Sequence, residues 1–141
     1  MEMTGRLLGL DIGGKRIGVA ISDEMGLVAS PVGMVPRGPN SGRQIRDHAE
    51  RLGAVGLVVG LPVGMSGREG PQAAEVRAFV DEIAPEIGLP VQWWDERLTT
   101  AIAERSLIAG GARRDKRKQQ VDAAAAAVIL QGYLDRQRWG R

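Results

Sequence analysis

The chain of 141 residues is 43% hydrophobic and 26% charged, with a formal net charge of +2. That balance is typical of one globular domain, here residues 1–141, and so mild a charge permits a nucleic-acid partner without requiring one. Cysteine is absent and His48 is the only histidine, which excludes disulfides, cysteine nucleophiles and zinc sites built from thiolates or several histidines, so any chemistry must use carboxylates, hydroxyls, cations or the backbone.

The first part of the chain is predicted to form three consecutive strands. Residues 7–12 and 16–22 are rich in Ile, Leu and Val, and Gly13-Gly14 between them is typical of a hairpin turn. A third strand is expected at residues 27–35, interrupted by Pro31. These strands are expected to form a meander.

Helices and strands are predicted to alternate after this meander. Ser41 is expected to cap a helix with an apolar face made of Ile45, Ala49 and Leu52. Residues 54–62 are apolar almost throughout, as in a strand that is buried on both faces. A glycine-rich loop at residues 63–70 then precedes a helix over residues 71–84, which we expect to break near Pro85.

The last part is predicted to contain a strand at residues 91–96, a helix at 99–109 and a final helix at 119–136. The basic segment at residues 112–118 is expected to be an exposed, mobile loop. Three strands followed by alternating elements favour an α/β fold, with a mixed five-stranded sheet and helices on both faces.

The sequence predicts no membrane segment. The first residues, MEMTGR, lack the apolar core of a signal peptide, and the longest apolar run, residues 123–130, is far too short to span a bilayer. We therefore expect a cytoplasmic protein without a membrane partner.

Four acidic residues lie where these elements could bring carboxylates together. Asp11 is inside the apolar strand LGLDIG, where an ionised carboxylate is costly unless it is paired or binds metal. Asp95 and Glu96 lie near the end of another strand, and strand alternation sends them to opposite faces, so only one can join Asp11. Asp122 opens the last helix and shares an inward stripe with Ala125, Ala126, Ile129 and Tyr133.

Three acids from two strands and a helix are therefore predicted to meet beside the sheet. Crowded like charges repel, and a hard cation such as Mg²⁺, which prefers oxygen ligands, relieves that repulsion. Two such ions, about 3.5–4 Å apart, would activate water and stabilise the leaving oxygen of a phosphodiester. The pattern predicts metal-dependent cleavage of a nucleic-acid backbone.

Each acid also has a simpler interpretation. Asp11 could pair with Lys15 or Arg16 across the hairpin, Asp122 could complement the helix dipole, and Glu96 could be a solvated residue at a strand end. Only the joint pattern favours a site.

Several cations are candidates for phosphate binding, because they lie beside glycines that allow close approach or in a dense cluster, RRDKRK at residues 113–118. A solvated loop is the alternative interpretation of that cluster. The predicted nucleic-acid-binding residues are Lys15, Arg16, Arg68, Arg97, Arg113, Arg114, Lys116, Arg117 and Lys118.

Four segments, in order, resemble the YqgF/RuvX family of Holliday-junction-resolvase-like proteins with the ribonuclease H fold. They are LGLDIGGKRIGVAISD (residues 8–23), VVGLPVGMSGREGPQA (58–73), WWDERLTT (93–100) and VDAAAAAVILQGYLD (121–135). The resemblance covers nearly the whole chain. It implies a ribonuclease H-like mixed sheet, a nucleic-acid substrate, and Mg²⁺ or Mn²⁺ as cofactor.

The resemblance also implies that Asp11, Glu96 and Asp122 are the catalytic and metal-binding residues, with Glu96 chosen over Asp95 in the DER segment. Two features depart from the family pattern. Gly64 and Ser66 stand where the family commonly carries Asn and Asp, and the alanine run at residues 123–127 replaces a larger aliphatic residue. The first departure weakens any substrate or metal role for the glycine-rich loop.

The resemblance leaves two substrates open: a four-way DNA junction in recombination and repair, or the 5′ end of precursor 16S ribosomal RNA in ribosome biogenesis. Because a junction needs two symmetric cuts, we expect a homodimer. Its surface could include the apolar final helix and Met25, Leu27, Val28 and Met34, although ordinary core packing explains the same residues.

Two other classes remain as alternatives. DIGGKRIGVAISD also resembles the first phosphate motif of actin-like and sugar-kinase-like ATPases, but a nucleotide clamp of that type needs two such domains around a cleft. A catalytically silent nucleic-acid-binding module with the same fold would bind its ligand without needing the acids.

Overall fold

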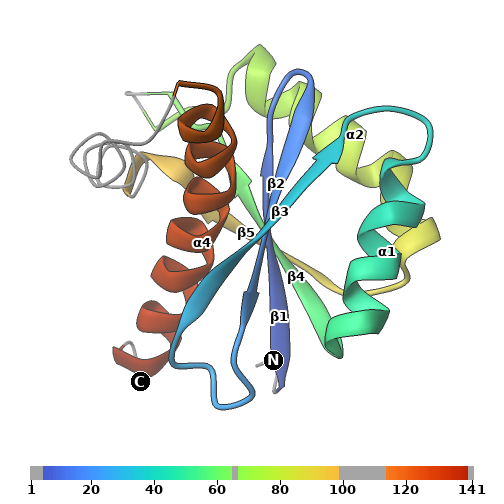
Figure 1. Cartoon of the computed structure of the whole chain (residues 1–141). Coiled ribbons are helices and arrows are strands. Elements are labelled where there is room, and N and C mark those ends of the chain that lie inside the picture. The colour runs from blue at the N-terminus through green and yellow to red at the C-terminus, as the bar shows by residue number, and fades with distance from the viewer. Residues whose placement is uncertain (1–4, 65–66, 99–113, 140–141) are drawn as a thin grey trace.

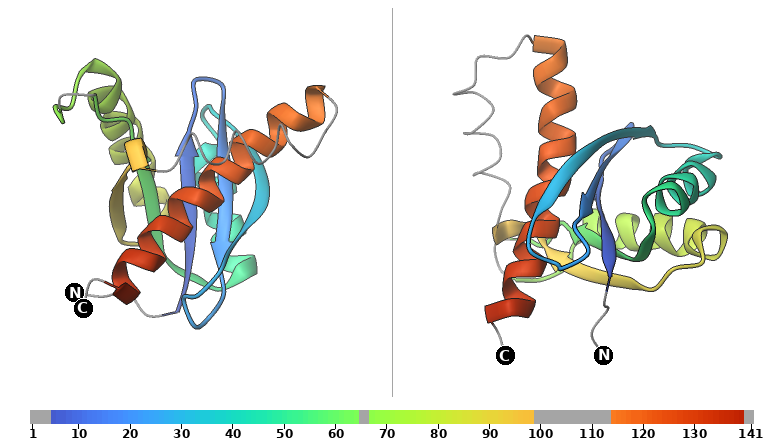
Figure 2. Two further views of the ribbon diagram at one scale, coloured as in Figure 1. Left: turned by 90° about the vertical axis from the view of Figure 1, so that its left-hand side faces the viewer. Right: turned by 60° about the horizontal axis from the view of Figure 1, so that its bottom comes forward.

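The computed structural model describes residues 5–64, 67–98 and 114–139. Its centre is a five-stranded sheet in the order β3-β2-β1-β4-β5. The strands are β1 (Arg6–Ile12), β2 (Arg16–Ser22), β3 (Ala29–Pro36), β4 (Ala54–Leu61) and β5 (Val91–Asp95). Helices α1 (Ser41–Leu52) and α2 (Pro71–Ile87) cover one face, and α4 (Arg114–Trp139) crosses the other (Figures 1 and 2). The predicted mixed sheet with helices on both faces is confirmed.

The direction of the strands decides where the acids lie. Strands β1, β2 and β3 are antiparallel neighbours, whereas β4 is parallel to β1 and β5 is parallel to β4. Short turns connect the antiparallel strands, and the parallel ones require crossovers through helices. The carboxyl ends of β1, β4 and β5 therefore meet at one edge of the sheet, beside the β1–β2 hairpin at the top of Figure 1.

The alternation of β1 produces two separate cores. Leu8 and Leu10 face α1 and α2, in a core formed mostly by large aliphatic side chains. Leu7 faces α4, and Gly9 lies against the same helix, at Ala126 and Leu130. Asp11, the next residue in this alternation, therefore lies on the α4 face of the sheet.

Several predicted element boundaries were wrong. Ser41 is the first residue of α1 rather than its cap, because its hydroxyl accepts a hydrogen bond from Gly38 N and donates one to Pro36 O. Helix α2 continues through Pro85 to Ile87, because this proline lies in the last turn, near the helix end at Gly88.

The basic segment was also placed wrongly. Residues 114–118, expected in a loop, form the first turns of α4, so the final helix begins five residues earlier than predicted. The third strand spans Ala29–Pro36 rather than 27–35; it is an edge strand whose register shifts at Pro31. The helix predicted at residues 99–109 lies outside the described residues. Within the described part, no helix is long and apolar enough to cross a membrane.

Helix α4 packs unusually close to β1 because Gly9 has no side chain. A Cβ atom at Gly9 would lie 2.7 Å from Leu130 Cβ and 2.8 Å from the carbonyl oxygen of Ala126. Backbone cannot yield as a flexible side chain can, so α4 could not lie where it does if this residue were larger.

We expect Gly9→Ala to lower the free energy of unfolding by about 1–3 kcal/mol, because α4 must move away from the strand. Urea denaturation followed by circular dichroism measures the change. Gly38→Ala is the matched control, since a Cβ there meets nothing within 4 Å. Equal effects of the two substitutions would contradict the close-packing argument.

Candidate active site

Two carboxylates meet on the α4 face of the sheet, at the carboxyl ends of the strands. Asp11 lies in β1, one residue before its end, and Glu96 follows β5 directly, as the first residue of a short 3-10 helix, η1 (Glu96–Leu98). A side-chain hydrogen bond joins Glu96 to Asp11. The sequence predicted that one acid of the DER segment would reach Asp11, and Glu96 is the one that the structure brings there.

Gly60 in β4 makes room for this contact. A Cβ at Gly60 would lie 2.8 Å from Glu96 Cγ, 2.9 Å from Glu96 Oε1 and 2.6 Å from Ile129 Cδ1 of α4. Because Leu10 of β1 is paired with Val59 of β4, Gly60 is next to Asp11 in the sheet. The Glu96 side chain therefore lies across a bare stretch of β4 to reach β1, with α4 covering it.

The electrostatic environment of Glu96 is unfavourable to its charged form. Burial, the hydrogen bond with Asp11 and the negative charges of Asp11 and Asp95 together raise the pKa of Glu96 to about 8. At neutral pH and without a cation, the two carboxylates thus share a proton.

Asp95, next to Glu96 in the chain, has the opposite environment. Arg97 donates to it from Nε at 2.9 and 3.1 Å, from Nη2 at 2.6 Å and from the backbone N at 3.0 Å. These hydrogen bonds from Arg97 hold the pKa of Asp95 below its ordinary value. Asp95 and Arg97 therefore close a tight turn around Glu96. Because β5 ends at Asp95, this turn, and not strand alternation alone, sets the direction of the Glu96 side chain.

The third predicted acid, Asp122, lies in α4, but its side chain is outside the described part of the structure. Its backbone position is still informative. It is one helical turn before Ala126, whose carbonyl oxygen lies against Gly9, and Gly9 is two residues before Asp11 on the same face of β1. Asp122 as a ligand at this site remains a prediction.

The predicted phosphate-binding cations are only partly described. Lys15 is exposed in the β1–β2 hairpin, Arg68 is exposed in the loop after β4, and Arg16 is half-buried. Arg97 binds Asp95 and lies 3.4 Å from the carbonyl oxygen of Gly64. Arg113 is outside the described residues, as are the side chains of four residues in the first turns of α4: Arg114, Lys116, Arg117 and Lys118.

Sequence reasoning missed Arg37, which follows β3. Its guanidinium donates to Gly13 O at 3.0 Å, pairs with Glu75 of α2 and lies 4.2 Å from the centre of the Phe79 ring. No periodic pattern identifies it, because it lies in the Pro- and Gly-rich segment RGPNSG (residues 37–42), between the third predicted strand and the first predicted helix. The only sequence feature that could have indicated this role is the position of a cation at the end of a predicted strand, next to the hairpin.

The donor chemistry fits a hard divalent cation. Two adjacent carboxylates that must share a proton in the absence of a cation offer the oxygen ligands that Mg²⁺ and Mn²⁺ prefer, and cation binding would displace that proton. The described side chains contain no cluster of three or more potential ligands; Asp11 and Glu96 are the two acids that the structure brings into contact here.

Solved structures with the same arrangement define the fold class. RuvC of Thermus thermophilus, in complex with a Holliday junction substrate, aligns over 96% of both chains with a TM-score of 0.56 and 15% identity. The Fowlpox virus resolvase, in complex with Holliday junction DNA, aligns over 94% of this chain and 98% of its own, with a TM-score of 0.55 and 12% identity. The fold is therefore that of the ribonuclease H-like resolvases.

The sequence comparison is more specific. The family model described as RuvX, Holliday junction resolvase, matches residues 5–136, and the chain belongs to this family of nucleases. A protein of Symbiobacterium thermophilum named "Putative pre-16S rRNA nuclease" is 46% identical over 132 residues, which are 92% of each chain. A Chelativorans protein with the same name is 50% identical over 92% of this chain and 82% of its own.

We expect Glu96→Gln to stabilise the metal-free protein at high pH. The raised pKa of Glu96 means that its contribution to stability is fully present below about pH 4.5 and is lost as the pH rises toward 8. The variant has no such loss, so its advantage should grow by on the order of 2 kcal/mol by pH 9, which is less than the full shift at about 1.4 kcal/mol per pKa unit because Glu96 is partly exposed to solvent. Urea denaturation in EDTA between pH 5 and 9 measures it.

Asp95→Asn is the matched control for this measurement. The pKa of Asp95 is lowered by Arg97, so its contribution is present above the ordinary pKa and lost only in acid. Removing it should not stabilise the protein at pH 9. A Glu96→Gln advantage that is constant across the pH range would contradict the shared-proton interpretation.

Proposed function

We propose that this nuclease is a divalent-metal-dependent endonuclease that hydrolyses phosphodiester bonds in a structured nucleic acid. The single observation that supports the proposal is the hydrogen-bonded pair of Asp11 and Glu96, which lies beside an exposed basic hairpin. Two acids held this close cost stability once both are charged. Cation binding is the function that offsets this cost.

In this proposal Asp11, Glu96 and Asp122 hold Mg²⁺ or Mn²⁺. A bound ion of this kind polarises the phosphate and lowers the pKa of its water ligand. Binding of such a cation would displace the proton shared by Glu96 and Asp11 to solvent, so both carboxylates would be charged only in the loaded protein. Lys15, Arg16 and Arg68, together with the basic first turns of α4, attract and orient the phosphate backbone.

We propose the 5′ end of precursor 16S ribosomal RNA as the substrate. The supporting observation is that relatives 42–50% identical to this chain carry that name. The second candidate is a four-way DNA junction, which is supported by the family description. Trimming one RNA end needs one active centre, whereas resolving a junction needs two centres related by symmetry.

We expect Asp11→Asn, Glu96→Gln and Asp122→Asn each to reduce cleavage about 10³-fold or more, because each removes a metal ligand. Substrate binding should be unchanged or tighter, since a repulsive negative charge has been removed near the phosphates. Cleavage of end-labelled RNA with Mn²⁺, and binding measured with Ca²⁺, separate the two effects.

Asp95→Asn is the control, and we expect it to be milder, because Asp95 binds Arg97 rather than the other acid. Full activity of Asp11→Asn would exclude the metal-site proposal. A larger loss of cleavage for Asp95→Asn than for Glu96→Gln would show that Asp95, and not Glu96, is the catalytic acid of the DER segment.

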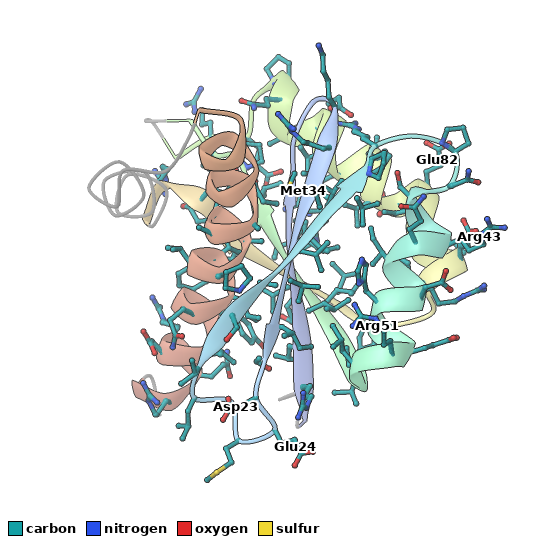
Figure 3. All side chains as sticks on the ribbon, in the orientation of Figure 1. Asp23, Glu24, Met34, Arg43, Arg51 and Glu82 are labelled. Atoms are coloured by element: carbon teal, nitrogen blue, oxygen red, sulfur yellow. The ribbon has the colours of Figure 1, made fainter. Side chains whose placement is uncertain are left out.

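The homodimer expected from the sequence has a specific candidate surface. The β2–β3 turn exposes Met25, Leu27 and Val28, with 79%, 38% and 57% of their surface accessible, at the end of the sheet opposite the hairpin (Figure 3). Asp23 accepts hydrogen bonds from Leu27 N and Val28 N, and Gln131 of α4 binds Leu27 O, so the turn is held in one conformation.

We expect sedimentation equilibrium to show a dimer that Met25→Ser combined with Val28→Ser converts to a monomer, because the exposed apolar area is then reduced. If the dimer is needed only for junctions, the double variant should lose cleavage of four-way DNA and keep RNA trimming. A wild-type protein that stays monomeric on four-way DNA, yet trims the RNA, would exclude the junction as its substrate.

A further inference from the structure

The β1–β2 hairpin begins two residues after Asp11, so its position is tied to the acid pair. Its tip contains Gly13, Gly14 and Lys15, closed by a hydrogen bond of 2.9 Å from Gly13 N to Arg16 O. Gly14 and Lys15 are exposed. Two adjacent glycines leave such a tip loose unless something outside the hairpin holds it.

Arg37 is the residue that holds it. Its backbone N donates to Lys15 O at 3.0 Å, and its Nη1 donates to Gly13 O at 3.0 Å. The other end of the same guanidinium binds Glu75, while its flat face lies over Phe79, both in α2. Arg37 thus connects the hairpin tip to a helix on the α1–α2 side of the sheet.

These contacts are not explained by the stability of the sheet alone. The ladder between β2 and β3 already runs to its last pair, Arg16 with Pro36, so the strands are joined without the guanidinium. The Arg37 side chain is only 16% exposed and its charge is balanced by Glu75. It is therefore badly placed to attract a phosphate itself, in contrast to Lys15.

We propose that Arg37 is a positioning residue, which fixes the hairpin tip so that Lys15 meets the phosphate backbone next to Asp11. The proposal rests on the nucleic-acid substrate proposed above. A mobile tip would have to be ordered each time substrate binds, which weakens binding. With Arg37 in place, that ordering is already present in the free protein.

A double-mutant cycle tests whether Arg37 acts through Lys15. Binding of a labelled stem-loop RNA and of a four-way DNA junction is measured in Ca²⁺ for Lys15→Gln, Arg37→Gln and the double variant. We expect about a three- to ten-fold loss for each single change, and a double variant that is no weaker than the worse single variant. A loss of affinity in the double variant equal to the product of the two single losses would overturn the proposal.

Arg43→Gln is the matched control, because it removes the same charge from the outer side of α1, away from the sheet (Figure 3). It should weaken binding less than two-fold and should combine multiplicatively with Lys15→Gln. In cleavage assays Arg37→Gln should raise KM with kcat within two-fold of wild type. A fall in kcat with an unchanged KM would overturn the positioning role.

A measurement without substrate separates this proposal from the proposed function. Amide hydrogen exchange at Gly13 should become at least ten-fold faster in Arg37→Gln, and Arg37→Lys, which keeps a cationic donor group without the planar guanidinium, should restore part of the protection. If Arg37→Gln does not fold, Arg37→Lys alone enters the cycle. Unchanged exchange overturns this proposal alone, whereas a wild-type protein that binds neither nucleic acid overturns the proposed function together with it.

Discussion

The contact between Asp11 and Glu96 is the constraint on which this end of the molecule depends, because two carboxyl groups so close together cannot both be charged without a cation. Two carboxylates on a covered face of the sheet would separate if their elements were free to move. The parallel arrangement of β1, β4 and β5 instead brings the acids to one edge, Gly60 leaves room for the Glu96 side chain, and the Asp95–Arg97 contact fixes the turn on either side of Glu96. Without a cation the pair keeps a shared proton at neutral pH, and a divalent cation would take the place of that proton.

The two faces of the sheet differ in composition: one face holds the larger aliphatic core, and the other holds the acid pair. The face under α1 and α2 is packed with large aliphatic side chains, which supply most of the apolar burial. The face under α4 is built partly from small residues, and Ala126 lies directly over Gly9. The small residues of the alanine run at residues 123–127 thus let the backbone of α4 come close to β1 at Gly9.

The sequence was sufficient for the parts of the fold that depend on periodicity. Residue alternation predicts the three-strand meander and the buried strand β4. The rule that the carboxyl ends of parallel strands lie together predicts an acid at the end of β5, near Asp11. Boundaries set by individual hydrogen bonds were not predictable. Ser41 could cap a helix or close the preceding turn, and only the position of Pro36 O decides between them. The role of Arg37 was not predictable for the same reason, because its hydrogen-bond partners, Gly13 and Glu75, are far from it in the sequence.

Three of the described arginines are engaged in ion pairs with carboxylates. Arg37 binds Glu75, Arg77 binds Glu69 while lying over Trp93, and Arg97 binds Asp95. Each of these guanidiniums is planar and multidentate, which suits it to joining segments of the protein, and each is balanced by a carboxylate. Such cations shape the rim of the site but add little net positive charge to it. In the described part of the chain, Lys15 and Arg68 are exposed cations outside these arginine–carboxylate pairs, and Arg37 fixes the backbone on either side of Gly14 through Gly13 O and Lys15 O.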